Sequence, residues 1–210
     1  MGLNNNRWNK VRYSFYAPIY HFAIKVLERP RSHAHSILQV KPDERVLICG
    51  CGTGSDLEFI PVTCDVEATD LTPVMVRKTQ ELASKLGMKV KTKTMDAGKL
   101  DYPDDHFDVV ILHLIVAVIP DPDSCLSEAR RVLKPGGRIS IFDKFLKEGQ
   151  QPSLFRKASG LVTELLFSNI NRQIEPLLKN HMLKVESDVA VFAGNFFRAL
   201  IVKHEDENAG

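Results

Sequence analysis

The chain has 210 residues, of which 44% are hydrophobic and 26% are charged, proportions that are typical of one soluble globular domain. Its longest apolar run, residues 109–120, is too short to cross a bilayer, and its N-terminus has no apolar core of the signal-peptide kind. The four cysteines show no metal-ligand spacing, so we expect reduced thiols, no bound metal and a cytoplasmic location.

The net charge of +2 conceals an uneven distribution. Residues 1–41 hold seven Lys or Arg and one acid, whereas the remainder holds 21 basic and 25 acidic residues. The acidic remainder disfavours nucleic acid as a partner, because such binding depends on neutralising phosphates. The basic end is also aromatic, which suits the inner face of an anionic membrane. We therefore expect either peripheral membrane contact through residues 1–28 or a helix that only packs on the rest of the protein.

Helical periodicity opens the chain. Apolar residues at 8–26 recur every three or four positions, which predicts helix. Pro18 disfavours α geometry at the residue before it, so we expect two helices hinged there, and a third short helix over 32–38. The pattern divides the chain into a helical lid over 1–41, a main domain over 42–204 and a mobile tail over 205–210.

From residue 45 onward, strand and helix patterns alternate, which predicts a doubly wound α/β sheet with helices on both faces. The expected strands are 45–49, 65–69, 89–94, 107–113 and 138–142. The expected helices between and after them are 54–60, 73–86, 122–133, 152–168 and 170–180. Two further strand-like runs, 183–192 and 196–203, flank a Gly-Asn turn and predict an antiparallel hairpin.

The first of these strands runs directly into Gly50, Gly52 and Gly54, and Asp70 follows at the end of the second strand. Glycine allows backbone to approach a ligand, and a carboxylate at that strand end can accept both hydroxyls of a ribose. The spacing G-x-G-x-G differs from the dinucleotide fingerprint, and no phosphate-binding Gly-Lys-Ser/Thr loop is present. The pattern predicts a pocket for an adenosine-containing molecule, with a nicotinamide-dependent oxidoreductase as a less favoured alternative.

Five motifs in order resemble those of the class I S-adenosylmethionine-dependent methyltransferases. They are the glycine motif at 46–54, the ribose-binding strand end at 68–75, the acidic dipeptide at 95–97, the fourth strand at 107–113 and the turn at 133–138. The resemblance implies a Rossmann-like sheet, mostly parallel with an antiparallel C-terminal hairpin. It also implies S-adenosylmethionine as cofactor and methyl transfer to a small-molecule or lipid acceptor. A non-catalytic regulatory protein that binds this cofactor is the alternative.

The same resemblance implies a set of site residues at the carboxyl ends of the strands. The candidate cofactor-binding residues are Tyr20, Gly50, Cys51, Gly52, Gly54, Asp70, Leu71, Met75, Asp96, Ala97 and His113. His113 and Asp143, each at a strand end, are candidate catalytic residues that could orient or deprotonate the acceptor. The family usually carries an acid where this chain has Ile48, so loop carbonyls or Asp56 would have to contact the amino group of the cofactor.

The acceptor is indicated by two further segments. Residues 13–20 resemble the Tyr-rich lid that opens the ubiquinone/menaquinone methyltransferases and the bacterial phosphatidylethanolamine N-methyltransferases. Residues 117–122 are similar to a run in the second of these groups. The resemblance therefore implies a phospholipid amine or a quinone-like acceptor, and the sequence does not indicate an oligomeric state.

Overall fold

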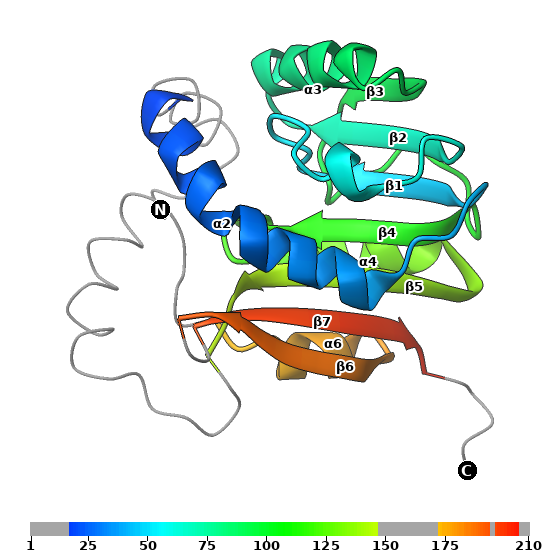
Figure 1. Ribbon diagram of the computed structural model, residues 1–210. Helices are drawn as coiled ribbons and strands as arrows, with labels where there is room; N and C mark the ends of the chain where they lie inside the picture. Colours follow the sequence, from blue (N-terminus) through cyan, green and yellow to red (C-terminus); the bar gives the residue numbers. More distant parts are fainter. Residues whose placement is uncertain (1–16, 147–171, 194–195, 206–210) are drawn as a thin grey trace.

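One seven-stranded sheet forms the centre of the described part of the molecule, with strand order β3-β2-β1-β4-β5-β7-β6 (Figure 1). The computed structural model describes residues 17–146, 172–193 and 196–205, with side chains from residue 26 onward. The strands are β1 (Arg45–Cys49), β2 (Asp65–Asp70), β3 (Val90–Thr94), β4 (Phe107–His113), β5 (Leu133–Lys144), β6 (Leu183–Phe192) and β7 (Phe197–His204). Strands β1 to β5 are parallel, and β7 is antiparallel to both β5 and β6. The expected sheet with its closing hairpin is confirmed.

Helices cover both faces of the sheet (Figure 1). They are α2 (Ala17–Leu38) and α3 (Pro73–Lys85) on one face, and α4 (Pro122–Val132) and α6 (Glu175–Asn180) on the other. Successive residues of β1 serve the two faces in turn, as the period of a strand requires. Val46 and Ile48 pack with residues of α2 and α3, whereas Leu47 and Cys49 pack with residues of α4 and α6. Two apolar cores thus sandwich the sheet.

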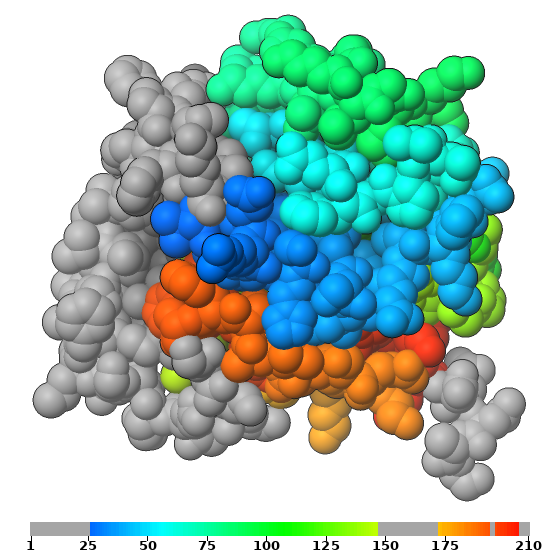
Figure 2. Space-filling view, viewed as in Figure 1, coloured from blue at the N-terminus to red at the C-terminus, as the bar shows by residue number. Residues whose placement is uncertain are grey.

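Helix α2 runs without a break through Pro30, so the expectation of a separate short helix over 32–38 is wrong. Ala34 and Leu38 follow Pro30 at four-residue spacing and are buried. This face packs against β5, β6 and β7, and its burial outweighs the hydrogen bond that proline removes. In Figure 2 the described end of α2 (blue) lies between the cyan segment after β1 and the orange strands. The first expected helix lies largely outside the described residues.

The expected helix over 54–60 is also wrong, because only a 3-10 turn, η1 (Leu57–Phe59), forms there. Gly54 has a φ of +86°, which is outside the helical region. Pro61 then disfavours α geometry at Ile60, which is extended with φ −105° and ψ 133°. The segment is therefore a compact turn that holds the residue before η1, Asp56, against the end of the sheet.

The remaining differences concern the ends of elements. Strand β5 is longer than the expected 138–142, and α6 occupies only the second half of the expected helix over 170–180. Pro176 at the start of α6 is compatible with a helix only in its first turn, which explains the late beginning. The expected helix over 152–168 lies outside the described residues, as do residues 206–210 of the expected mobile tail.

Candidate active site

The turn after β1 brings bare backbone to the carboxyl edge of the sheet. Gly50, Gly52 and Gly54 all have positive φ values, of +69°, +55° and +86°, which residues other than glycine rarely adopt. A Cβ atom on Gly50 would lie 2.7 Å from Cδ1 of Ile115, so this position also lacks space for a side chain. These constraints explain the glycine spacing in the sequence and fix the path of the turn.

Asp70, at the end of β2, is bonded directly to this turn. One carboxylate oxygen accepts a hydrogen bond from the Gly52 amide at 3.0 Å, and the other accepts from the Thr72 amide at 2.8 Å. Burial raises the pKa of Asp70, and the two amide bonds oppose that rise. The carboxylate therefore joins the ends of β1 and β2 and lies where the sequence places the ribose contact.

The segment after β3 lies beside Asp70. The Met95 amide donates to the Asp70 carbonyl at 3.0 Å, which places the next two residues at the same edge. Asp96 accepts from the Gly98 amide at 3.0 Å, and Ala97 is buried. The structure thus brings together the glycine turn, Asp70 and Asp96, as the sequence predicts.

Two more predicted contacts follow Asp70 along the chain. Leu71 is half-buried, and Met75 is buried in the first turn of α3. Tyr20 lies in α2, but its side chain lies outside the described residues, so its predicted contact stays a prediction. The roles of the other residues toward a cofactor are likewise predictions, now supported by their proximity.

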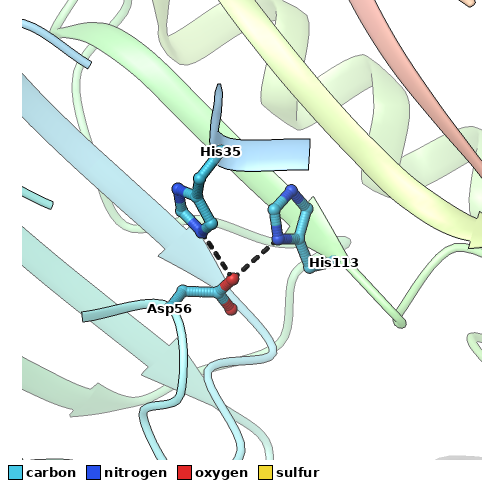
Figure 3. Close-up of side chains that lie close together, drawn as sticks. All are labelled: His35, Asp56 and His113. Carbon is cyan, nitrogen blue, oxygen red and sulfur yellow. Dashed lines mark hydrogen bonds and ion pairs between the residues drawn. The ribbon is translucent and has the colours of Figure 1, made fainter. Parts of the chain in front are cut away.

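A buried carboxylate, Asp56, forms a second centre beside the glycine turn (Figure 3). Its Oδ2 atom lies 2.7 Å from Nη1 of Arg31, and its Oδ1 atom lies 2.9 Å from Nε2 of His35 and 2.7 Å from Nδ1 of His113. Arg31 and His35 come from α2 and His113 from the end of β4. We call Arg31, His35, Asp56 and His113 the Asp56 cluster, which ties the N-terminal helix to the sheet.

The charges of this cluster follow from its geometry. Burial opposes ionisation of Asp56, but the Arg31 guanidinium and the two imidazoles outweigh it and hold the pKa of Asp56 well below its usual value. An ionised carboxylate only accepts, so His35 and His113 donate to it. Burial lowers the pKa of His113 to about 4 against the pull of Asp56, so this ring is neutral at pH 7. Its Nε2 atom then accepts from the Ser140 hydroxyl at 2.9 Å.

Comparison with known proteins agrees with this geometry. Residues 47–141 match the family described as "Methyltransferase domain". These residues form a methyltransferase domain. The matched segment begins in β1 and ends in β5, so it contains the glycine turn, Asp70, Asp56 and His113. The chain is an S-adenosylmethionine-dependent methyltransferase, as its sequence motifs imply.

Similar proteins extend the match in different ways. The phosphatidylethanolamine N-methyltransferase of Cereibacter sphaeroides is 29% identical over 185 residues, which cover 87% of this chain and 91% of that protein. The ubiquinone/menaquinone biosynthesis C-methyltransferase UbiE of Burkholderia mallei is 33% identical over 108 residues, which cover 50% of this chain and 44% of that protein. The geranyl diphosphate C-methyltransferase of Streptomyces coelicolor, solved with S-adenosylhomocysteine, has a TM-score of 0.67 at 16% identity over 83% of this chain and 79% of that chain. This last likeness shows a shared fold.

The residues of the methyltransferase fit its cofactor. The glycine turn offers bare backbone, and Asp70 offers a carboxylate at the position of a ribose. Beside them is a small pocket lined by Arg31, Gly50, Cys51, Thr53, Ser55, Asp56, His113 and Leu114. Its wall carries charges of both signs next to the glycine turn, which suits a ligand that carries both charges.

The two predicted catalytic residues, His113 and Asp143, differ in how much of their hydrogen-bonding capacity is still unused. His113 uses both ring nitrogens within the protein, on Asp56 and Ser140. Asp143 is also buried, and its two oxygens accept from the amides of Ala117 and Lys144, each at 2.8 Å. Burial raises the pKa of Asp143 against the opposing effect of Lys144. A carboxylate has four lone pairs, so Asp143 retains hydrogen-bond capacity that His113 lacks, but at 0% exposure it acts on a ligand only through the residues that it holds.

Two other activities that the Asp56 cluster suggests are disfavoured by its surroundings. Ligand atoms of His35, Asp56 and His113 lie within 4.8 Å of one another, a spacing compatible with a metal ion. However, the Arg31 guanidinium balances the charge of Asp56, so the cluster lacks the net negative charge that would hold a divalent metal ion. Asp56, His113 and Ser140 also follow the hydrogen-bond order of a hydrolase triad. Ser140 is 0% exposed in the middle of β5, so no ester can reach its hydroxyl.

The neutral state of His113 predicts a pH dependence of stability. Its pKa in the folded protein, about 4, lies below the ordinary value of 6.5, so protonation favours the unfolded chain. The stabilisation is complete above pH 6.5 and is lost as the pH falls toward 4, by about 2 kcal/mol between pH 7 and pH 5. Replacing His113 with Asn, which keeps a donor near Asp56, should reduce the pH dependence by that amount. Urea unfolding of both proteins at pH 7 and pH 5 measures the change in the free energy of unfolding. An equal change in the two proteins would contradict the prediction.

Arg31 and His35 are site residues that sequence reasoning missed. Both lie four residues apart on α2, and they reach Asp56 across 25 and 21 residues of sequence. Polar residues at helical spacing usually lie on a solvated face, so the sequence offered no reason to single them out. A polar pair on the same side of the helix as Ala34 and Leu38 was the one available signal.

Proposed function

We propose that this methyltransferase transfers a methyl group to the amino group of a phospholipid headgroup. The observation that carries the proposal is the extent of the similarity to the Cereibacter phosphatidylethanolamine N-methyltransferase, which covers 87% of this chain. The similarity to UbiE covers only 50% of the chain, about the extent of the methyltransferase domain itself. Both relatives are methyltransferases by name but differ in acceptor, so similarity outside the shared domain bears on the acceptor.

The chemistry asks two things of the protein. S-adenosylmethionine supplies an electrophilic methyl group on a sulfonium, so the main task is to align the acceptor and exclude water. An ammonium headgroup must also lose a proton before its nitrogen can attack. Asp143 at the end of β5 is fully buried, so it is our candidate for orienting the acceptor through the loop whose Ala117 amide it holds, rather than for receiving that proton itself. His113 is proposed to position Asp56 and β4 rather than to move a proton.

A phospholipid acceptor requires access to a membrane surface. No helix among the described residues is long and apolar enough to cross a bilayer. We propose peripheral contact through the basic and aromatic residues 1–28, because cationic side chains are attracted to anionic headgroups and aromatic rings favour the interface. The inner face of the membrane is the proposed location of this contact.

The proposal predicts label transfer from S-adenosylmethionine carrying a tritiated methyl group. The full chain should label phosphatidylethanolamine in vesicles, and faster when anionic lipid is added, but it should not label phosphatidylcholine, whose nitrogen has no site left for a methyl group. The control is the Asp70→Ala variant, in which label should be lost. Label in a quinol that lacks its ring methyl group, and none in the lipid, would move the acceptor to the quinone class. Cofactor binding without any transfer would favour the regulatory alternative.

A further inference from the structure

Two oppositely charged side chains, both largely shielded from water, lie on the wall of the pocket beside the glycine turn. Arg31 and Asp56 are 6% and 3% exposed and contact each other at 2.7 Å on its wall. Nε of Arg31 and Nδ1 of His35 are buried and have no hydrogen-bond partner within the described part of the chain. Buried polar atoms without partners are costly, so the unpaired Nε of Arg31, a residue on the pocket wall, points to a ligand there.

We propose that Arg31 and Asp56 bind the amino-acid end of the cofactor, with Arg31 on its carboxylate and Asp56 on its ammonium group. The ligand chemistry is that of a zwitterionic α-amino acid joined to an adenosine. The inference rests on the S-adenosylmethionine dependence of the enzyme and not on the identity of the acceptor.

The position of the pocket supports this assignment. Gly50 and Cys51 belong to the glycine turn and also line the pocket, so the wall with Arg31 and Asp56 adjoins the turn. Ile48, near the end of β1, is buried in the apolar core on the side of α2 and α3 and offers no charge to a ligand. Among the described residues, Asp56 is the only carboxylate on the pocket wall.

The bonding capacity of the two side chains also supports it. A guanidinium has five N–H donors in a fixed plane, and Arg31 spends one of them on Asp56 in the described structure. Within the described residues, Oδ2 of Asp56 accepts from Arg31 alone, whereas Oδ1 accepts from both imidazoles, so Oδ2 retains a lone pair for an ammonium group. Because His113 is neutral, Arg31 and Asp56 form a charge-balanced pair that matches a zwitterion, with one charge for each end of it.

One consequence concerns the N-terminal helix. Arg31 belongs to α2, whereas the glycine turn belongs to the sheet, so a cofactor held by both would link them. Bound cofactor would then stabilise the docked position of α2, in addition to its contact through Asp56. Binding of the amino-acid end and docking of α2 therefore stabilise each other in this proposal.

A ligand pair isolates the Arg31 contact. S-adenosylhomocysteine and its decarboxylated analogue, 5′-S-(3-aminopropyl)-5′-thioadenosine, differ only by the carboxylate, and calorimetry gives the dissociation constant of each. We expect wild-type protein to bind the analogue roughly 10- to 100-fold more weakly, as for loss of a charge-assisted bond. In Arg31→Met the two ligands should bind almost equally. The matched control, Arg29→Met, changes an exposed arginine on the same helix and should keep the wild-type ratio.

The outcomes are separable. If the ratio of the two dissociation constants in Arg31→Met equals the wild-type ratio, the proposal is wrong. That result leaves the proposed acceptor open, because the label-transfer experiment tests the acceptor independently. A protein that merely folds poorly would bind both ligands more weakly without a change of their ratio. If Arg31→Met does not fold, Arg31→Lys keeps the charge but shortens its reach, and a ratio lowered at least threefold is expected. An unchanged ratio in that variant overturns the proposal equally. Absence of S-adenosylhomocysteine binding by wild-type protein would overturn the cofactor assignment with it.

Discussion

Replacement of Asp56 with alanine is expected to lower the free energy of unfolding by about 3–5 kcal/mol. The carboxylate is the ionic partner of Arg31, which has 7% of its side chain exposed, and it accepts from His35 and His113 as well. Without it, a buried guanidinium and two imidazole N–H groups lose their acceptor. Because these bonds join α2 to the sheet, we expect the loss of the carboxylate to destabilise both the helix and the end of β4. Urea unfolding followed by circular dichroism measures the change.

Asp104→Ala provides the matched control. Asp104 also lies 2.7 Å from an arginine, Arg131, but its side chain is 73% exposed, so its removal should cost less than about 1 kcal/mol. The double variant Arg31→Met, Asp56→Leu should recover part of the stability lost in Asp56→Ala, because it removes the buried cation together with its partner. A cost at Asp56 no larger than that at Asp104 would show that the cluster does not hold the fold together.

The sheet could be predicted because its signals are local. Phe107–His113 contains the unbroken apolar run 109–112, as a central parallel strand requires, and Pro73 and Gly87 mark where α3 begins and where it has ended. The glycine turn and Asp70 could be placed together because the carboxyl ends of parallel strands share one edge. These features depend on a few neighbouring residues, so the pattern along the chain was sufficient.

The errors occurred where contacts distant in sequence decide the outcome. Pro30 favours a break in the helix, but the buried side of α2 against β5, β6 and β7 keeps it continuous. The Asp56 cluster is assembled in the same way, because His35 reaches Asp56 across 21 residues of sequence and Asp56 reaches His113 across a further 57. Helix propensity and apolar spacing describe single elements, so they cannot show which polar side chains of two elements will meet.

Replacement of Asp70 with alanine is expected to weaken the binding of S-adenosylhomocysteine by about 100-fold, as for the loss of charge-assisted hydrogen bonds. The carboxylate holds the amides of Gly52 and Thr72, and it is the predicted partner of the ribose hydroxyls. Its removal takes away both the ligand contact and the bond that fixes the glycine turn. Calorimetric titration measures the effect, and Asp65→Ala is the control, because Asp65 lies exposed at the opposite end of the same strand.

The same titration separates the two charged contacts proposed for the cofactor. 5′-Methylthioadenosine keeps the ribose but lacks the amino-acid end, so Asp70→Ala should weaken this ligand and S-adenosylhomocysteine alike. Arg31→Met should weaken only S-adenosylhomocysteine, because the pocket wall formed by Arg31 and Asp56 has nothing to hold in the shorter ligand. If Asp70→Ala leaves both affinities within about threefold of wild type, Asp70 serves only to brace the turn after β1, and the ribose must be bound elsewhere.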